Sequence, residues 1–227
     1  MVFSVVRVPF LLEPDYPEDA IYVETNRERL EKKWGGPQGW NIQKQRHDLK
    51  GRGLEAGIPH FNLDRLASNT VASHRLVQKI GKTYGLGISE KLYDALNVYY
   101  FVDGKSLNDH ESLAKLTEII LKEHVAEKNI PIMTRDQTLE FLKSTEGRRE
   151  IEHALHVLKT QLNIHSIPKF IVEGQTLIDG AAQADVFVKV FQKILDRGYA
   201  HSTTPIFADI LGLTPELFHR GSHANFK

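Results

Sequence analysis

The stretch that decides the fold runs Pro168-Lys169-Phe170-Ile171-Val172-Glu173-Gly174-Gln175-Thr176-Leu177-Ile178. Two short runs rich in β-branched and aromatic residues flank a Gly174-Gln175 turn, which is the pattern of a β-hairpin. After the hairpin, apolar residues recur at helical spacing and predict an amphipathic helix over 185–195. Its apolar face consists of Phe187, Val190, Phe191 and Ile194.

Upstream of the hairpin the pattern is mainly helical. Residues 2–12 are apolar and β-branched, and they predict a strand that Pro9 and the Glu13-Pro14-Asp15 turn bring to an end. Periodicity and capping residues then predict helices over 26–34, 42–56, 71–84, 90–101, 109–128, 135–144 and 146–162, with an extended surface segment over 58–63. Two short helical pieces are expected in the tail, over 206–211 and 215–218. The order is strand, several helices, hairpin, helix, which indicates an α/β fold.

Composition excludes several classes of protein. The 227 residues are 41% hydrophobic and 26% charged, as in ordinary globular proteins. Lys plus Arg and Asp plus Glu balance at 29 each, so no charge excess favours nucleic acid or an anionic membrane as a partner. No apolar run approaches the roughly 20 residues that a membrane-spanning helix needs.

The sequence contains no cysteine, which is the most informative count. This excludes disulfides, thiolate nucleophiles and cysteine-ligated metals from the chain. The apolar N-terminal stretch contains Arg7 and an acidic flank, whereas a secretory signal begins with positive charge and ends in small residues. We therefore expect a cytoplasmic protein.

Three segments together resemble the DsbA-like family of thioredoxin-fold proteins. This family includes FrnE-like oxidoreductases, 2-hydroxychromene-2-carboxylate isomerases and kappa-class glutathione transferases. Residues 5–19 are similar to the family's second core strand and its Phe-x-Leu-x-Pro continuation. Residues 68–76 are similar to the pattern Asn-Thr-x-x-Ala-His-Arg-Leu, and residues 163–183 are similar to the hairpin block. The resemblance covers roughly residues 2–195 and is closest to the FrnE-like branch.

The resemblance implies a thioredoxin-like sheet with a large α-helical insertion. Residues 1–15 and 164–197 would form the core, 16–163 the insertion and 198–227 a C-terminal extension, all within a single structural domain. The family's first strand and helix, which carry Cys-x-x-Cys or a catalytic Ser, have no counterpart in the sequence. We therefore expect an incomplete sheet that lacks its first strand, in a truncated or degenerate member of the family.

Three functions stay open under this resemblance. The first is that of an oxidoreductase relative without redox activity, which keeps at most the binding of a peptide or thiol ligand. The second is a glutathione-dependent isomerase or transferase of the kappa type, with glutathione as its ligand. The third is a non-catalytic interaction protein that forms homo-oligomers through an exposed sheet edge. We expect no catalytic residue, resident cofactor or metal in this chain.

The resemblance also assigns five ligand-binding residues, namely Ile167, Pro168, Asn69, Arg75 and Gln183. It implies a cis peptide bond between Ile167 and Pro168, and a backbone at Ile167 that pairs with the ligand like an added strand. Alternatively, Pro168 simply begins a strand. Arg75 could instead serve in packing or capping, since its neighbours on the helix are apolar.

A metal site is the remaining alternative raised by the sequence. Glu150, His153 and His156 lie three residues apart on one predicted helix, so they share a face. Carboxylate-bridged sites need a second such motif on another helix, and we find none. Surface histidines on an amphipathic helix are the better interpretation.

Overall fold

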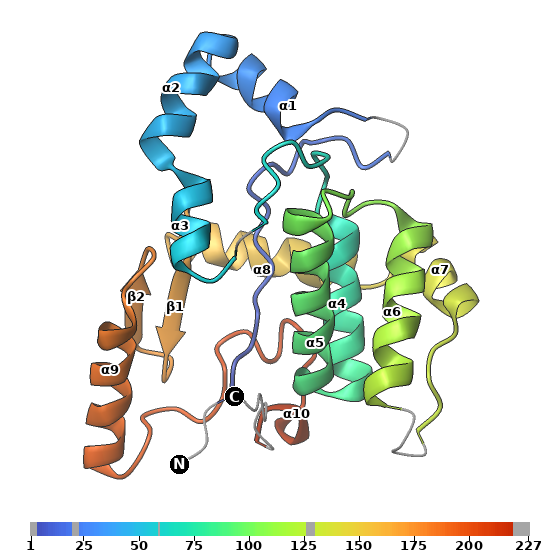
Figure 1. Cartoon of the computed structure of the whole chain (residues 1–227). Coiled ribbons are helices and arrows are strands. Elements are labelled where there is room, and N and C mark those ends of the chain that lie inside the picture. Colours follow the sequence, from blue (N-terminus) through green and yellow to red (C-terminus); the bar gives the residue numbers. More distant parts are fainter. Residues whose placement is uncertain (1–3, 20–22, 59, 126–129, 220–227) are drawn as a thin grey trace. The chain divides into compact units, whose positions relative to one another are not determined.

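The computed structural model describes residues 4–19, 23–58, 60–125 and 130–219 (Figure 1). Its elements are α1 (Asn26–Lys33), α2 (Pro37–His47), α3 (Leu49–Glu55), α4 (Val71–Tyr84), α5 (Leu86–Asn97), the π-helical turn η1 (Val98–Val102), α6 (His110–His124), α7 (Arg135–Lys143), α8 (Arg148–Thr160), β1 (Lys169–Val172), β2 (Thr176–Asp179), α9 (Ala184–Arg197) and α10 (Pro215–His219). The fold is thus mixed and rich in helices, as the sequence predicts.

The chain divides into two compact units, which we describe separately. The helical unit comprises Glu13–Leu76 and Lys91–Ser144. The hairpin unit comprises Met1–Leu12, Val77–Glu90 and Thr145–Lys227. The division expected from the resemblance, with a core of 1–15 and 164–197, stays a prediction.

The packing of α6 against α7 forms one part of the core of the helical unit. Asp109 caps α6 by accepting the Ser112 N–H, and Thr134 forms a capping box with Gln137 at α7. The face of α6 that is buried consists of Leu113, Ala114, Thr117, Ile120 and Leu121. Both helices lie within one or two residues of the predicted ranges, apart from residues 126–129, which lie outside the described residues.

Two helix predictions in the helical unit need correction. The single helix expected over 42–56 begins earlier, at Pro37, and is interrupted at Asp48, whose φ of 38° is left-handed. Asp48 ends α2 and at the same time caps α3 by accepting the Gly51 N–H. The polar pattern alone did not indicate this break.

The helix expected over 90–101 is also wrong at both ends. The helix α5 begins at Leu86, and Ser89 lies inside it, donating its hydroxyl to the Leu86 carbonyl at 2.8 Å. Beyond Asn97 the chain continues as η1, a π-helical turn in which the backbone hydrogen bonds span five residues instead of four. Such turns are rare and leave little trace in a sequence pattern.

The hairpin unit is built around the apolar face of α8. Its buried cluster contains Leu86, Ala154, Val157, Leu158, Ile164, Phe207, Ala208, Leu211, Leu213 and Phe218. The tail therefore contributes half of this core, which its polar composition did not suggest. Residues 206–211 form turns, not the expected helix, whereas α10 confirms the helical piece predicted over 215–218.

The strand expected over 2–12 is not formed by residues 4–12, and residues 1–3 lie outside the described residues. Its alternation is nevertheless real, because Val6, Val8 and Phe10 all pack against the α8 cluster. What is missing is a ladder: the sheet among the described residues consists of β1 and β2 alone. A strand requires a neighbour to pair with, so the alternating segment stays irregular.

The β-hairpin is confirmed, with a loop one residue longer than predicted. Its antiparallel register pairs Lys169 with Asp179 and Val172 with Thr176. Glu173 and Gly174 both have positive φ, and the Gln175 N–H bonds the Val172 carbonyl at 3.2 Å. Figure 1 shows α9 lying against this hairpin.

Candidate functional site

The loop before β1 holds Ile167 at the surface. Asn163 follows α8 with a φ of 52°, so it supplies the left-handed conformation that a glycine would otherwise provide. The Ile164 N–H bonds the Leu158 carbonyl at 2.8 Å, and its side chain is buried in the α8 cluster. At the other end, the Gly180 N–H bonds the Pro168 carbonyl at 3.0 Å. Between these anchors Ile167 is 45% exposed.

The Ile167–Pro168 peptide bond is cis, as the resemblance implies. Pro168 directly precedes β1 and accepts the last hydrogen bond of the hairpin, so it also marks the start of the strand. The cis bond is therefore confirmed, whereas pairing of the Ile167 backbone with a ligand stays a prediction.

Gln183 is the third predicted site residue in the hairpin unit. It occupies the N-cap position of α9, is exposed, and its side chain makes no capping hydrogen bond. Near it, the rings of Phe170 on β1 and Phe187 on α9 meet edge to face at 4.9 Å. This contact joins helix and hairpin, and it leaves Phe170 43% exposed.

Asn69 and Arg75 belong to the helical unit, where each has structural partners. Asn69 is 3% exposed, accepts the Val71 N–H at 2.8 Å and donates to the Tyr16 carbonyl at 2.6 Å. It thus caps the start of α4 and holds the chain at Tyr16 beside it. A ligand-binding role for Asn69 stays a prediction.

Arg75 is also buried, with 3% of its surface exposed. Its guanidinium donates to the carbonyls of Phe141, Leu142 and Ser144 at 3.0, 3.3 and 2.7 Å. These carbonyls lie at the C-terminal end of α7, where cations are favoured by the helix dipole. This placement agrees with the packing or capping interpretation of Arg75, and its ligand-binding role stays a prediction.

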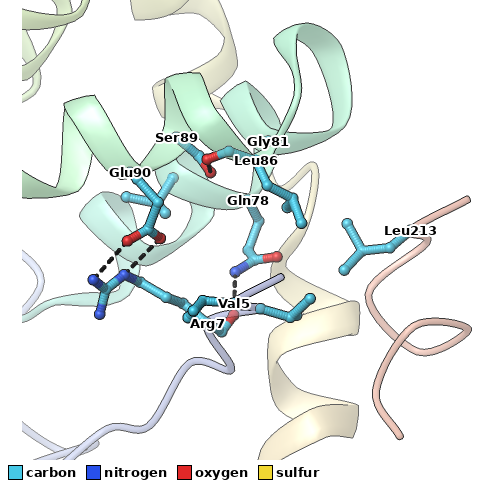
Figure 2. A pocket seen from close by; sticks show the side chains of 10 residues that line it. Val5, Arg7, Gln78, Gly81, Leu86, Ser89, Glu90 and Leu213 are labelled. Carbon is cyan, nitrogen blue, oxygen red and sulfur yellow. Dashed lines mark hydrogen bonds and ion pairs between the residues drawn. The ribbon is translucent and has the colours of Figure 1, made fainter. Parts of the chain in front are cut away.

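A small hollow in the hairpin unit is lined by the N-terminal segment, by α4 and α5, and by Leu213 (Figure 2). At its edge Arg7 makes two hydrogen bonds of 2.7 Å with the Glu90 carboxylate, and Gln78 donates to the Arg7 carbonyl at 2.9 Å. Ser89 also lines it, but its hydroxyl already donates to the Leu86 carbonyl. These contacts explain the charge inside the apolar stretch: Arg7 fastens the segment to α5.

Nothing in the described part of the chain groups three or more His, Asp or Glu side chains as a metal site would. Glu150 instead pairs with Lys82 at 3.3 Å, while His153 and His156 are exposed on α8. Within the same described residues, no helix is long and apolar enough to cross a membrane.

Comparison of the sequence with protein-family models and with curated proteins gives no match. Among solved structures, the chain is similar to a probable DsbA oxidoreductase from Streptomyces coelicolor. The sequence identity is 22% and the TM-score 0.65, and the match covers 87% of this chain and 75% of that chain. At this identity the likeness concerns the fold, which is that of a DsbA-like thioredoxin-fold protein with a small two-stranded antiparallel sheet.

The capping role of Arg75 predicts a stability effect. Arg75→Met keeps much of the side-chain volume but removes the guanidinium donors from the carbonyls at the end of α7, of which Phe141 keeps the Ser144 hydroxyl as a donor. Each buried group left unpaired costs about 1–3 kcal/mol. We expect urea denaturation to show a loss on the order of 3 kcal/mol. Arg46→Met, at an exposed position on α2, should stay within about 0.5 kcal/mol of the parent chain. Equal stability of both variants would show that Arg75 is not a cap.

His110, the first residue of α6, predicts a pH dependence. Burial lowers the pKa of its imidazole, the charges of Arg75 and Lys143 lower it further, and Asp109 and Glu18 oppose them. Below the ordinary value of 6.5 the unfolded chain binds a proton that the folded chain rejects, so stability falls as the pH drops through 6.5.

The measurement is urea denaturation between pH 7.5 and about pH 5. His110→Gln should flatten this part of the stability profile, because the substituted side chain does not titrate. His153→Gln, at an exposed position on α8, serves as the control and should keep the parent profile. A profile that His110→Gln leaves unchanged contradicts the assignment.

Proposed function

We propose that this chain is a cysteine-free, redox-inactive relative of the DsbA-like oxidoreductases, of the FrnE-like branch, that binds a ligand without thiol chemistry. The absence of cysteine on a DsbA-like fold carries the proposal. Disulfide exchange proceeds by attack of a thiolate, and no residue of this chain can form one. A cytoplasmic location is part of the proposal.

The binding site is the loop at Ile167 and Pro168. Three observations support it: Ile167 is exposed, both ends of the loop are anchored, and the loop leads directly into β1. A fixed, extended backbone at the surface offers main-chain groups to a ligand at little cost in conformational entropy. The ligand would be a peptide or a thiol compound, and the exposed Gln183 belongs to the same unit of the chain.

A second candidate is a non-catalytic interaction protein that assembles through this unit. Large apolar side chains are exposed on the hairpin, on the loop before it and on α9, at Ile167, Phe170, Leu177, Val186, Val188 and Leu195. Exposed large apolar side chains are typical of interaction surfaces where they form a contiguous patch. The glutathione-dependent isomerase or transferase also stays open, and glutathione is therefore included as a probe below.

The first prediction is the absence of disulfide chemistry. Insulin reduction and refolding of scrambled ribonuclease should proceed at the rate of the buffer blank, because the chain contains no sulfur nucleophile. Addition of a thioredoxin to the same samples verifies that each assay responds. Turnover that persists through repurification of the chain would refute redox inactivity.

The second prediction locates the ligand. In a titration followed by amide NMR, a bound peptide or glutathione should shift the resonances of Ile167 and Lys169. Ile167→Ala keeps the backbone donor and should bind within a few-fold of the parent chain, whereas Ile167→Pro removes the N–H and should weaken binding at least about tenfold. Thermal melting verifies that both variants are folded. Binding that shifts other residues and ignores both substitutions would place the site elsewhere.

A further inference from the structure

The hydrogen-bond pattern of β1 fixes which of its backbone groups face β2. The Gly180 N–H bonds the Pro168 carbonyl, so Lys169 and Asp179 form a non-hydrogen-bonded pair. By alternation, Phe170 and Val172 direct their N–H and C=O groups to β2. Lys169 and Ile171 direct theirs away from β2, and we call these groups the outer edge of β1.

Within the described part of the chain, no strand pairs with this outer edge. An open edge offers donors and acceptors two residues apart, which is the spacing of a β-ladder. The edge continues toward Ile167, the exposed residue of the proposed binding loop.

Apolar side chains lie on both faces of β1 beside this edge. On one face Ile171 packs against the α8 cluster, together with Val6, Val8 and Phe10 of the N-terminal segment. On the other face Phe170 contacts Phe187 of α9. The helix α9 is itself incompletely covered, since Ile194 is its one buried residue. A strand added at the edge would thus meet apolar surface with both rows of its side chains.

The charges of the hairpin are already paired. Lys169 pairs with Asp179, and Glu173 pairs with Arg197 and also accepts the His201 N–H. Glutathione carries two carboxylates and an ammonium group, and binding it needs opposite charges or donors that replace its water. An uncharged segment makes no such demand, so the charge pattern favours it over glutathione.

We propose that the outer edge of β1 binds an extended, uncharged, largely apolar polypeptide segment as an added β-strand. This inference rests on the proposed function, whose ligand it names. Main-chain hydrogen bonds to Lys169 and Ile171 supply the affinity, and alternate side chains of the segment contact the faces of Ile171 and Phe170.

The test is amide hydrogen exchange of the isotope-labelled chain, read residue by residue. In the free chain, Phe170 and Val172 should be protected and Lys169 and Ile171 should exchange at least about tenfold faster. The probe is a short, acetylated and amidated peptide of alternating Val and Thr. Its addition should slow exchange at Lys169 and Ile171 at least about tenfold and leave Phe170 and Val172 unchanged.

Two control probes sharpen the result. The same peptide N-methylated at every residue keeps its side chains, but it loses its backbone N–H donors and its methyl groups block the close approach of a paired strand, so it should give no protection. Reduced glutathione should give none either. If Lys169 and Ile171 are as protected as Phe170 in the free chain at low concentration, or if the Val-Thr peptide leaves them unchanged, the inference is overturned.

The outcomes also separate this inference from the proposed function. Glutathione that shifts Ile167, while the Val-Thr peptide protects nothing, overturns the inference and leaves the proposed function standing. Peptide protection that survives in Ile167→Pro supports the inference and removes the Ile167 loop from the site. Protection that rises with the concentration of the chain itself, without peptide, identifies a second copy as the occupant and overturns the assignment to a separate segment.

Discussion

The hydrogen-bonding requirement of the strand backbone is the constraint on which the hairpin unit depends. A polar main-chain group that leaves water needs a partner, and β2 provides one for every second residue of β1. A two-stranded hairpin is at best marginally stable in isolation. Its stability here comes from packing, through Ile164 and Ile171 on the α8 cluster and Phe170 on Phe187. These side chains hold β1 in place, although no other described strand lies beside its outer backbone groups.

The parts of the fold that could be predicted from the sequence are those with local causes. The helix α4 begins where Asn69 caps it, and the hairpin loop forms around Gly174, because each residue acts within a few positions of itself. The segment containing Val6 and Val8 shows where local reasoning stops. The apolar, β-branched composition is a property of the segment and predicts a strand, whereas the ladder depends on its neighbours and is not formed among the described residues. Burial of Phe207 and Leu211 in the tail depends on α8, some 50 residues earlier, and the short helical piece expected over 206–211 does not indicate this partner.

The candidate site divides in the same way. The left-handed Asn163 acts locally, at the end of α8, and Ile167 is assigned to the site by the family resemblance of 163–183. The environment of Arg75 has no such local cause. A guanidinium fork matches a ligand carboxylate and the main-chain carbonyls of a helix end about equally well, since both present oxygen acceptors. What identifies its partners is the return of the chain at Phe141 to Ser144, more than 60 residues later. Sequence reasoning therefore gave the right chemical type and left the partner open.

The absence of cysteine changes what a DsbA-like fold can offer. Function resides in particular sites, and a likeness of fold carries none of the chemistry that a missing residue would perform. In the proposed site, the groups available for recognition on the hairpin are the main-chain groups at Lys169 and Ile171 and apolar side chains such as Phe170 and Ile171. Main-chain hydrogen bonds are the same for every residue type except proline, so they select a ligand by its backbone conformation and not by the identity of its side chains. A surface of this kind selects extended chains over folded ones, which is a binding specificity that needs no catalytic residue.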